Sequence, residues 1–149
     1  MIKTSSKFLF IASLFFLYAC SSDPDPIKYG HDNCEHCKML ISDHNYGAEL
    51  ITQKGKIFKF DSIECLADYQ RALSNEEIHS MWVVNFYPPN ELININNAHF
   101  LLSDNLRSPM GLYLSAFNND VELNKIAEKY GGKEINWENL LEYVNKKWN

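Results

Sequence analysis

The feature that most constrains the fold of this chain is a succession of strand and helix patterns that occurs twice. Residues 47–53 and 57–60 alternate apolar and polar side chains around a short polar turn, which predicts a β-hairpin. Asp61 and Glu64 then have the spacing of a capping box, so we expect Asp61 to cap a helix that ends near residue 73. Residues 81–86 are predominantly apolar and predict a buried strand.

The second half of the chain repeats this order of elements, although its residues hardly match those of the first half. The predicted strands, helix, strand and final helix are residues 98–102, 110–117, 120–130, 133–135 and 137–148. We therefore predict an α+β protein with two small ββαβ halves, residues 31–88 and 89–149, that share one core. A length of 149 residues suits this arrangement.

The N-terminus has the pattern of an export signal. Lys3 and Lys7 precede an apolar run at residues 8–19, which as a helix would be about 18 Å long and too short for a hydrocarbon layer of about 30 Å. The run ends at Cys20, as in a bacterial lipobox, so we predict a signal peptide at residues 1–19 and lipidation of Cys20. Plain secretion, with Cys20 as a spare thiol, is the alternative.

Residues 20–30 are then a polar tether, and the protein is expected in the cell envelope, anchored to a membrane by its lipid. The net charge of −5 becomes more negative once the two signal-peptide lysines are removed. An acidic body without a basic cluster argues against nucleic-acid binding. The sequence contains no P-loop, dinucleotide-binding glycine motif, nucleophile elbow or HExxH motif, which argues against the corresponding enzyme classes.

Residues 31–39 concentrate the side chains with metal-binding chemistry. Cys34 and Cys37 form a CxxC pair, and Met39 follows two residues later. Thiolate and thioether are soft donors, and the ion that prefers both is Cu(I). His31 and His36 could add a nitrogen ligand, although loop histidines are more often simply exposed.

Three other interpretations of the CxxC pair remain open. A structural zinc site would need Cys65 as a third thiol and His79 or His99 as a fourth ligand. A thiol–disulfide oxidoreductase would use Cys34 and Cys37 as its redox pair, but that motif normally follows a strand and opens a helix. A plain structural disulfide is compatible with the predicted compartment.

Several short motifs follow the lipobox in a distinctive order. They are Cys34-x-x-Cys37-x-Met39, Phe58-Lys59-Phe60-Asp61, Ile63-Glu64-Cys65, Ser108-Pro109-Met110-Gly111, Ala116-Phe117 and Tyr130-Gly131-Gly132-Lys133. Over residues 30–135 the chain thereby resembles the NosL family, lipoproteins that accompany the assembly of nitrous oxide reductase. Lys38 stands where many relatives have glycine, a departure that concerns the turn more than the ligands.

The resemblance implies a Cu(I)-binding accessory protein that passes copper towards the reductase and its membrane maturation complex, with no substrate turned over. It implies two ββαβ halves similar to the N-terminal part of organomercurial lyase. It also implies Cys34, Cys37, Met39 and Met110 as the metal ligands. Cys65 would lie inside the first helix, where a buried and inert cysteine is the more frequent outcome.

Overall fold

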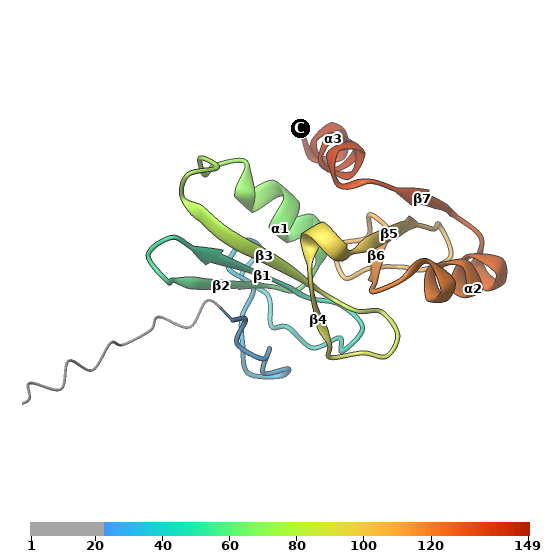
Figure 1. The fold of residues 1–149 in the computed structure, drawn as a ribbon, viewed down its shortest axis with the longest axis horizontal. Coiled ribbons are helices and arrows are strands. Elements are labelled where there is room, and N and C mark those ends of the chain that lie inside the picture. The colour runs from blue at the N-terminus through green and yellow to red at the C-terminus, as the bar shows by residue number, and fades with distance from the viewer. Residues whose placement is uncertain (1–22) are drawn as a thin grey trace, which may run out of the picture.

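Two antiparallel sheets and three α-helices make up the fold (Figure 1). The structure is a computed structural model that describes residues 23–149. The elements of the first half are β1 (Ala48–Thr52), β2 (Ile57–Phe60), α1 (Ile63–Gln70), β3 (Ile78–Val84) and β4 (Leu92–Asn94). Those that follow are the 3-10 turn η1 (Ile95–Asn97), β5 (His99–Leu102), β6 (Leu114–Phe117), α2 (Asp120–Tyr130), β7 (Lys133–Ile135) and α3 (Trp137–Trp148).

The predicted order of strand, strand, helix and strand is confirmed in both halves, and so is the α+β class. The first sheet has the strand order β2-β1-β3-β4, and the second has β6-β5-β7. The short strand β4 was not expected from the sequence; it pairs with β3, so the first sheet extends beyond residue 88. The first strand of each half, β1 or β5, lies in the interior of its sheet. The strand after the helix pairs with it: β3 pairs with β1, and β7 pairs with β5.

One hydrophobic core joins the halves. It contains Leu50, Phe60 and Leu66 from the first half together with Phe100 and Leu114 from the second, all essentially buried. Helix α3 also contributes to this core, and it packs against α1, so the last helix of the chain returns to the first half (Figure 1). The sheets are further tied where the Phe86 N–H donates to the Ala116 carbonyl over 2.8 Å.

Helix α1 begins one residue later than the sequence predicted. Ser62, with extended backbone angles, is the N-cap, and its Oγ accepts from the Cys65 N–H at 3.3 Å. The predicted cap at Asp61 and its capping box with Glu64 are therefore wrong. The Glu64 carboxylate instead accepts a hydrogen bond from the Ser108 hydroxyl of the second half. This shift places Asp61 before the helix and frees its side chain for another role.

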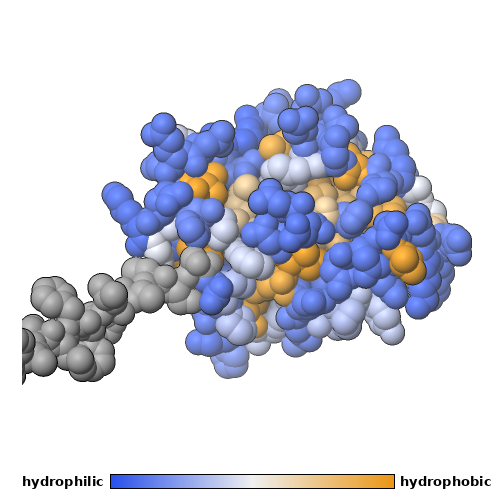
Figure 2. All heavy atoms as spheres, viewed as in Figure 1, coloured by the Kyte–Doolittle hydropathy of each residue, from blue (hydrophilic) through white to orange (hydrophobic). Residues whose placement is uncertain are grey.

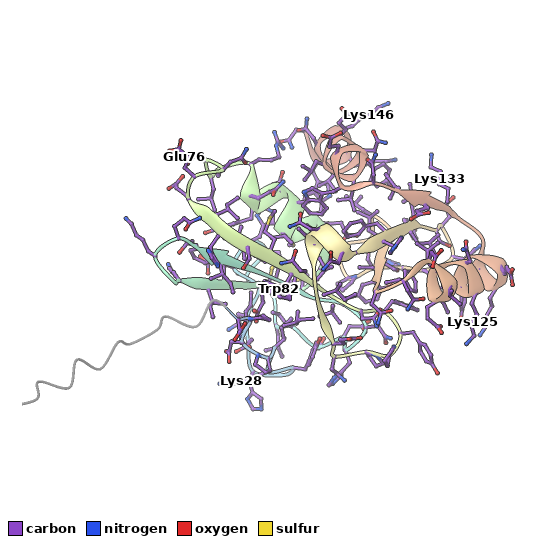
Figure 3. All side chains as sticks on the ribbon, in the orientation of Figure 1. Lys28, Glu76, Trp82, Lys125, Lys133 and Lys146 are labelled. Atoms are coloured by element: carbon purple, nitrogen blue, oxygen red, sulfur yellow. The ribbon has the colours of Figure 1, made fainter. Side chains whose placement is uncertain are left out.

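The outer surface is mainly hydrophilic, with small apolar patches between charged side chains (Figure 2). Lys125 on α2, Lys133 on β7 and Lys146 on α3 point away from the body of the protein (Figure 3). Within residues 23–149, no helix has the length and apolar character needed to cross a bilayer. The predicted signal peptide and Cys20 lie outside the described residues and stay predictions.

Candidate metal centre

The CxxC motif lies in a tight loop rather than at the start of a helix. Asn33 and Leu40 form an isolated antiparallel bridge at its base. Within the loop, the Cys34 N–H donates to the Met39 carbonyl at 2.8 Å, and the Lys38 N–H donates to the Cys34 carbonyl at 2.9 Å. Lys38 has φ of +63°, a left-handed conformation that glycine adopts without strain. Lys38 therefore occupies a position in the turn where the backbone conformation favours glycine.

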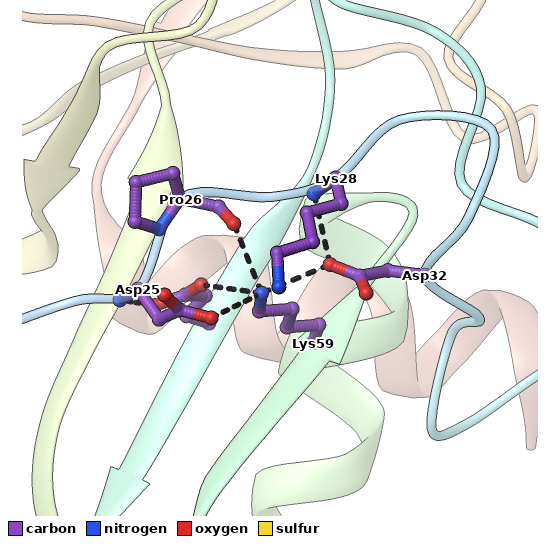
Figure 4. A network of polar contacts seen from close by, with 6 residues as sticks. Asp25, Pro26, Lys28, Asp32 and Lys59 are labelled. Carbon is purple, nitrogen blue, oxygen red and sulfur yellow. Dashed lines mark hydrogen bonds and ion pairs between the residues drawn. The ribbon is translucent and has the colours of Figure 1, made fainter.

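Strand β2 holds this loop from two directions. The Glu35 N–H donates to the Lys59 carbonyl at 2.8 Å, and the Lys59 ammonium contacts the Asp32 carboxylate at 2.9 Å. The same ammonium reaches Asp25 at 2.8 Å and the Pro26 carbonyl at 3.0 Å (Figure 4). Lys59 therefore fastens both the tether and the loop to the sheet.

Four potential ligands converge beside this loop. The sulfur atoms of Cys34, Cys37 and Cys65 and a carboxylate oxygen of Asp61 all lie within 4.8 Å of one another. Cys34 and Cys65 are fully buried, whereas Cys37 is partly exposed. Three segments contribute: the loop supplies two thiols, the residue after β2 supplies the carboxylate, and the first turn of α1 supplies Cys65. The three thiols are free, so the cluster is a reduced, sulfur-rich site.

Hydrogen bonding and burial give the three thiols different pKa values. The pKa of Cys34 falls to about 6, chiefly because the Cys65 thiol donates to its sulfur, with a further contribution from the Cys37 N–H at 3.5 Å. Burial, together with the negative charges of Cys34 and Asp61, raises the pKa of Cys37 to about 11. The pKa of Cys65 is raised because its proton is shared with Cys34 and because it is buried. Cys34 is accordingly the most acidic thiol of the group.

Asp61 is the member of the cluster that the sequence did not identify. Its Oδ2 accepts from the Cys37 thiol at 3.4 Å, while its Oδ1 has no hydrogen-bond partner among the described residues. The residue is only 4% exposed. The spacing Asp61-x-x-x-Cys65 could have suggested the pair, since residues four apart across a helix start can face the same side. The expected capping role of Asp61 obscured that signal.

The two predicted methionines differ in their surroundings. Met39 is 48% exposed and, with Asp61 and Pro109, lines a cavity of about 310 Å³. Met110 is partly buried and packs against the main core, next to Pro109. The loop of the first half and Pro109 of the second therefore border one cavity. Cys34 and Cys37 are brought together with Cys65 and Asp61. Metal binding by Met39 and Met110 stays a prediction.

The Ser108-Pro109-Met110-Gly111 motif is anchored to the helix that carries Cys65. The Ser108 hydroxyl donates to Glu64 and accepts from the Tyr113 N–H at 2.9 Å. Glu64 is fully buried, and that burial raises the pKa of its carboxyl group. The motif thus connects the second half to α1 beside the thiols, so Ser108 has a structural role in this contact.

The histidines of the motif region are not part of the cluster. His31 is exposed, and His36 faces Asp68 at 3.4 Å and stacks on Trp148 with ring centroids 5.8 Å apart. His79 is exposed on β3, and His99 pairs with Glu134 at 3.0 Å. The histidine that the zinc hypothesis required is thus not supplied by His79 or His99, and a carboxylate takes that place in the four-residue group.

Comparisons with known proteins agree with this fold. The crystal structure of the copper chaperone NosL from Shewanella denitrificans is similar, with a TM-score of 0.67 and 23% sequence identity, over 78% of this chain and 93% of that chain. No curated protein matches the sequence significantly. The NosL family model matches residues 27–144, which include the CxxCxM loop, the thiol cluster and both sheets, and the chain therefore belongs to the NosL family.

Proposed function

We propose that this protein binds Cu(I) through its thiol cluster and delivers it, as a membrane-tethered accessory protein, for the maturation of nitrous oxide reductase. The observation that carries the proposal is the convergence of Cys34, Cys37 and Cys65, three sulfur donors from two separate segments of a NosL-family chain. Such a soft, sulfur-rich donor set suits Cu(I). The structural relative that is named as a copper chaperone supports the same assignment.

Delivery needs a route between the thiols and a partner protein. Asp61 belongs both to the cluster and to the wall of the cavity that Met39 borders at the surface. Cys37, the partly exposed thiol, contacts the same Asp61. A partner's ligands could therefore approach along the Met39 side and take the ion stepwise. The copper-receiving reductase and its membrane maturation complex are the partners we propose.

Two observations favour metal binding over thiol–disulfide exchange. The most acidic thiol, Cys34, is 0% exposed, whereas attack on a protein disulfide requires an accessible thiolate. The CxxC pair also lies in a bridged loop, without the preceding strand and following helix typical of thioredoxin-like motifs. We therefore propose a binding and delivery role in which no substrate is turned over.

Anaerobic titration of the reduced protein should show one tightly bound Cu(I) per chain. The measurement is competition with a chromophoric Cu(I) chelator, together with metal analysis of the purified protein. The proposal would be contradicted if the protein gives up its Cu(I) to a weak chelator. It would also be contradicted if the three thiols remain fully reactive towards a thiol reagent after Cu(I) is added.

Met110→Leu is expected to weaken Cu(I) binding by at least about tenfold, or about 1.4 kcal/mol, if its sulfur closes over the bound ion. The fold should survive, because leucine and methionine have similar volumes and such exchanges cost less than about 1.5 kcal/mol. Met81→Leu on β3 is the matched control, because Met81 is likewise partly buried and packs against the main core. Equal affinities for the two variants would make Met110 a packing residue only.

Membrane attachment rests on the predicted lipobox. Mass spectrometry of the mature N-terminus should find an acylated Cys20, and the Cys20→Ala variant should leave the membrane fraction. An uncleaved Met1, or a mature protein that begins beyond Cys20, would contradict tethering while leaving the copper proposal intact.

A further inference from the structure

Asp61 has a donor atom without a partner inside a sulfur cluster. Its Oδ1 is buried and has no hydrogen-bond partner among the described residues, while its Oδ2 accepts from the Cys37 thiol at 3.4 Å. None of the described residues forms an ion pair with it. A buried carboxylate oxygen without a hydrogen-bond partner is costly, so its position beside three thiols points to a cation.

The nearest described basic side chain along the chain, Lys59, does not neutralise Asp61. Its ammonium contacts Asp25 and the Pro26 carbonyl in the tether and Asp32 at the base of the loop (Figure 4). The positive charge that strand β2 provides is therefore directed to the tether and the loop base. A cation at the thiol cluster would be the direct counter-charge for Asp61.

We propose that Asp61 is the fourth ligand for Zn(II) at this cluster and sets its selectivity between Zn(II) and Cu(I). The inference rests on the proposed use of the same thiols for Cu(I). A tetrahedral zinc ion with Zn–S bonds of about 2.3 Å and a Zn–O bond of about 2.0 Å needs ligand atoms roughly 3.5–3.8 Å apart. The four donors lie within 4.8 Å of one another, so a contraction of about 1 Å would close the site.

The two ions use the carboxylate differently. Zn(II) has borderline softness and accepts carboxylate oxygen along with thiolate sulfur in a closed tetrahedral site. Cu(I) favours soft sulfur donors, for which Cys34, Cys37 and Cys65 already suffice. The negative charge of Asp61 also attracts a divalent ion more strongly than a monovalent one. Asp61 therefore stabilises bound Zn(II) more than bound Cu(I).

The test compares both metals in Asp61→Asn, which keeps the side-chain shape and removes the charge. With the full-length, reduced protein in detergent, we expect Zn(II) affinity to fall at least about tenfold in competition with a chromophoric zinc chelator. The Cu(I) affinity should change by a smaller factor than the Zn(II) affinity does. Asp43→Asn is the matched control, because Asp43 lines the same cavity outside the cluster and its carboxylate accepts from the nearby Asn45 N–H. It should alter neither affinity.

The outcomes separate this inference from the proposed function. Unchanged Zn(II) affinity, or an equal loss for both ions, would overturn the role of Asp61. If the wild type binds no Cu(I), but Asp61→Asn binds Zn(II) more weakly than the wild type does, copper delivery is refuted and the role of Asp61 as a ligand is supported. Should Asp61→Asn melt well below the control, X-ray absorption of the Zn(II)-loaded wild type decides: three sulfur atoms and one oxygen are expected, and a shell lacking oxygen overturns the proposal.

Discussion

Cys34→Ser is expected to lower the Cu(I) affinity by at least about a hundredfold, or about 2.7 kcal/mol, the largest effect of any single ligand change. Cys34 is the centre of the thiol cluster: the Cys37 N–H donates to its sulfur, and the Cys65 thiol shares a proton with it. Serine keeps the size and a hydrogen-bonding group but replaces a soft sulfur with a hard oxygen, which Cu(I) binds poorly.

The measurement is a competition titration of the wild type and of the three single cysteine variants under anaerobic conditions. Cys37→Ser should lose less affinity than Cys34→Ser, because Cys37 lies at the exposed edge of the cluster. A thermal melt of each metal-free variant shows whether its fold is retained. An affinity for Cys34→Ser within threefold of the wild type would exclude Cys34 as a ligand and move the site towards Met39.

The sequence was sufficient to predict the parts of this site that depend on local spacing. The Cys34–Cys37 pair is visible because two residues between cysteines allow both sulfurs to meet across one turn. The two ββαβ sets were visible from the alternation of hydrophobic residues and from turn and cap residues, and most strands and helices lie close to their predicted ranges. Strand β6 is the exception, because it begins at Leu114 and the predicted range began at residue 110. Such signals are local, so a single sequence carries them.

The remaining parts depend on tertiary contacts. Asp61 satisfies the sequence pattern of an N-cap, but Ser62 takes that role, and a shift of one residue decides whether the carboxylate faces the helix or the thiols. Glu64 satisfies the pattern of a capping box, but its partner is Ser108, which is 44 residues away along the chain. Strand β4 follows two prolines and is only three residues long, so pairing with β3 defines it more than its own composition.

The same distinction explains the outcome for Cys65. Inside a helix, a cysteine next to apolar residues has the signature of core packing, and Cys65 is indeed fully buried. Its place in the thiol cluster follows from the loop of residues 34–39 packing over the first turn of α1, a contact that no local pattern encodes. Burial and metal binding are therefore compatible at this position, because the loop supplies the other donors.

Replacing Lys59 with methionine is expected to lower the free energy of unfolding by about 2–4 kcal/mol, a large effect for a single charged side chain. The Lys59 side chain is only 13% exposed, and it is paired with Asp25 and Asp32. It also lies 3.9 Å from Glu49, whose carboxylate is fully buried. Methionine fills a similar space without a charge, so the three carboxylates would be left without their common cation.

The pKa values show which group would respond. Burial already raises the pKa of Glu49 to about 7, and Lys59 acts against that rise. Without Lys59, the Glu49 carboxyl group should hold its proton to higher pH. Because a raised carboxyl pKa means that the folded state loses stability as the group ionises, the variant should be most unstable above neutral pH and recover part of its stability towards pH 5.

Urea unfolding at pH 5 and pH 8 measures both effects, with Lys54→Met in the exposed β1–β2 turn as the matched control. That control should stay within about 0.5 kcal/mol of the wild type at either pH. Lys59→Met should also bind Cu(I) more weakly, since the ammonium that holds Asp32 at the base of the Cys34 loop is gone. Stability equal to that of Lys54→Met at both pH values would show that the tether and the loop are held by their backbone hydrogen bonds alone.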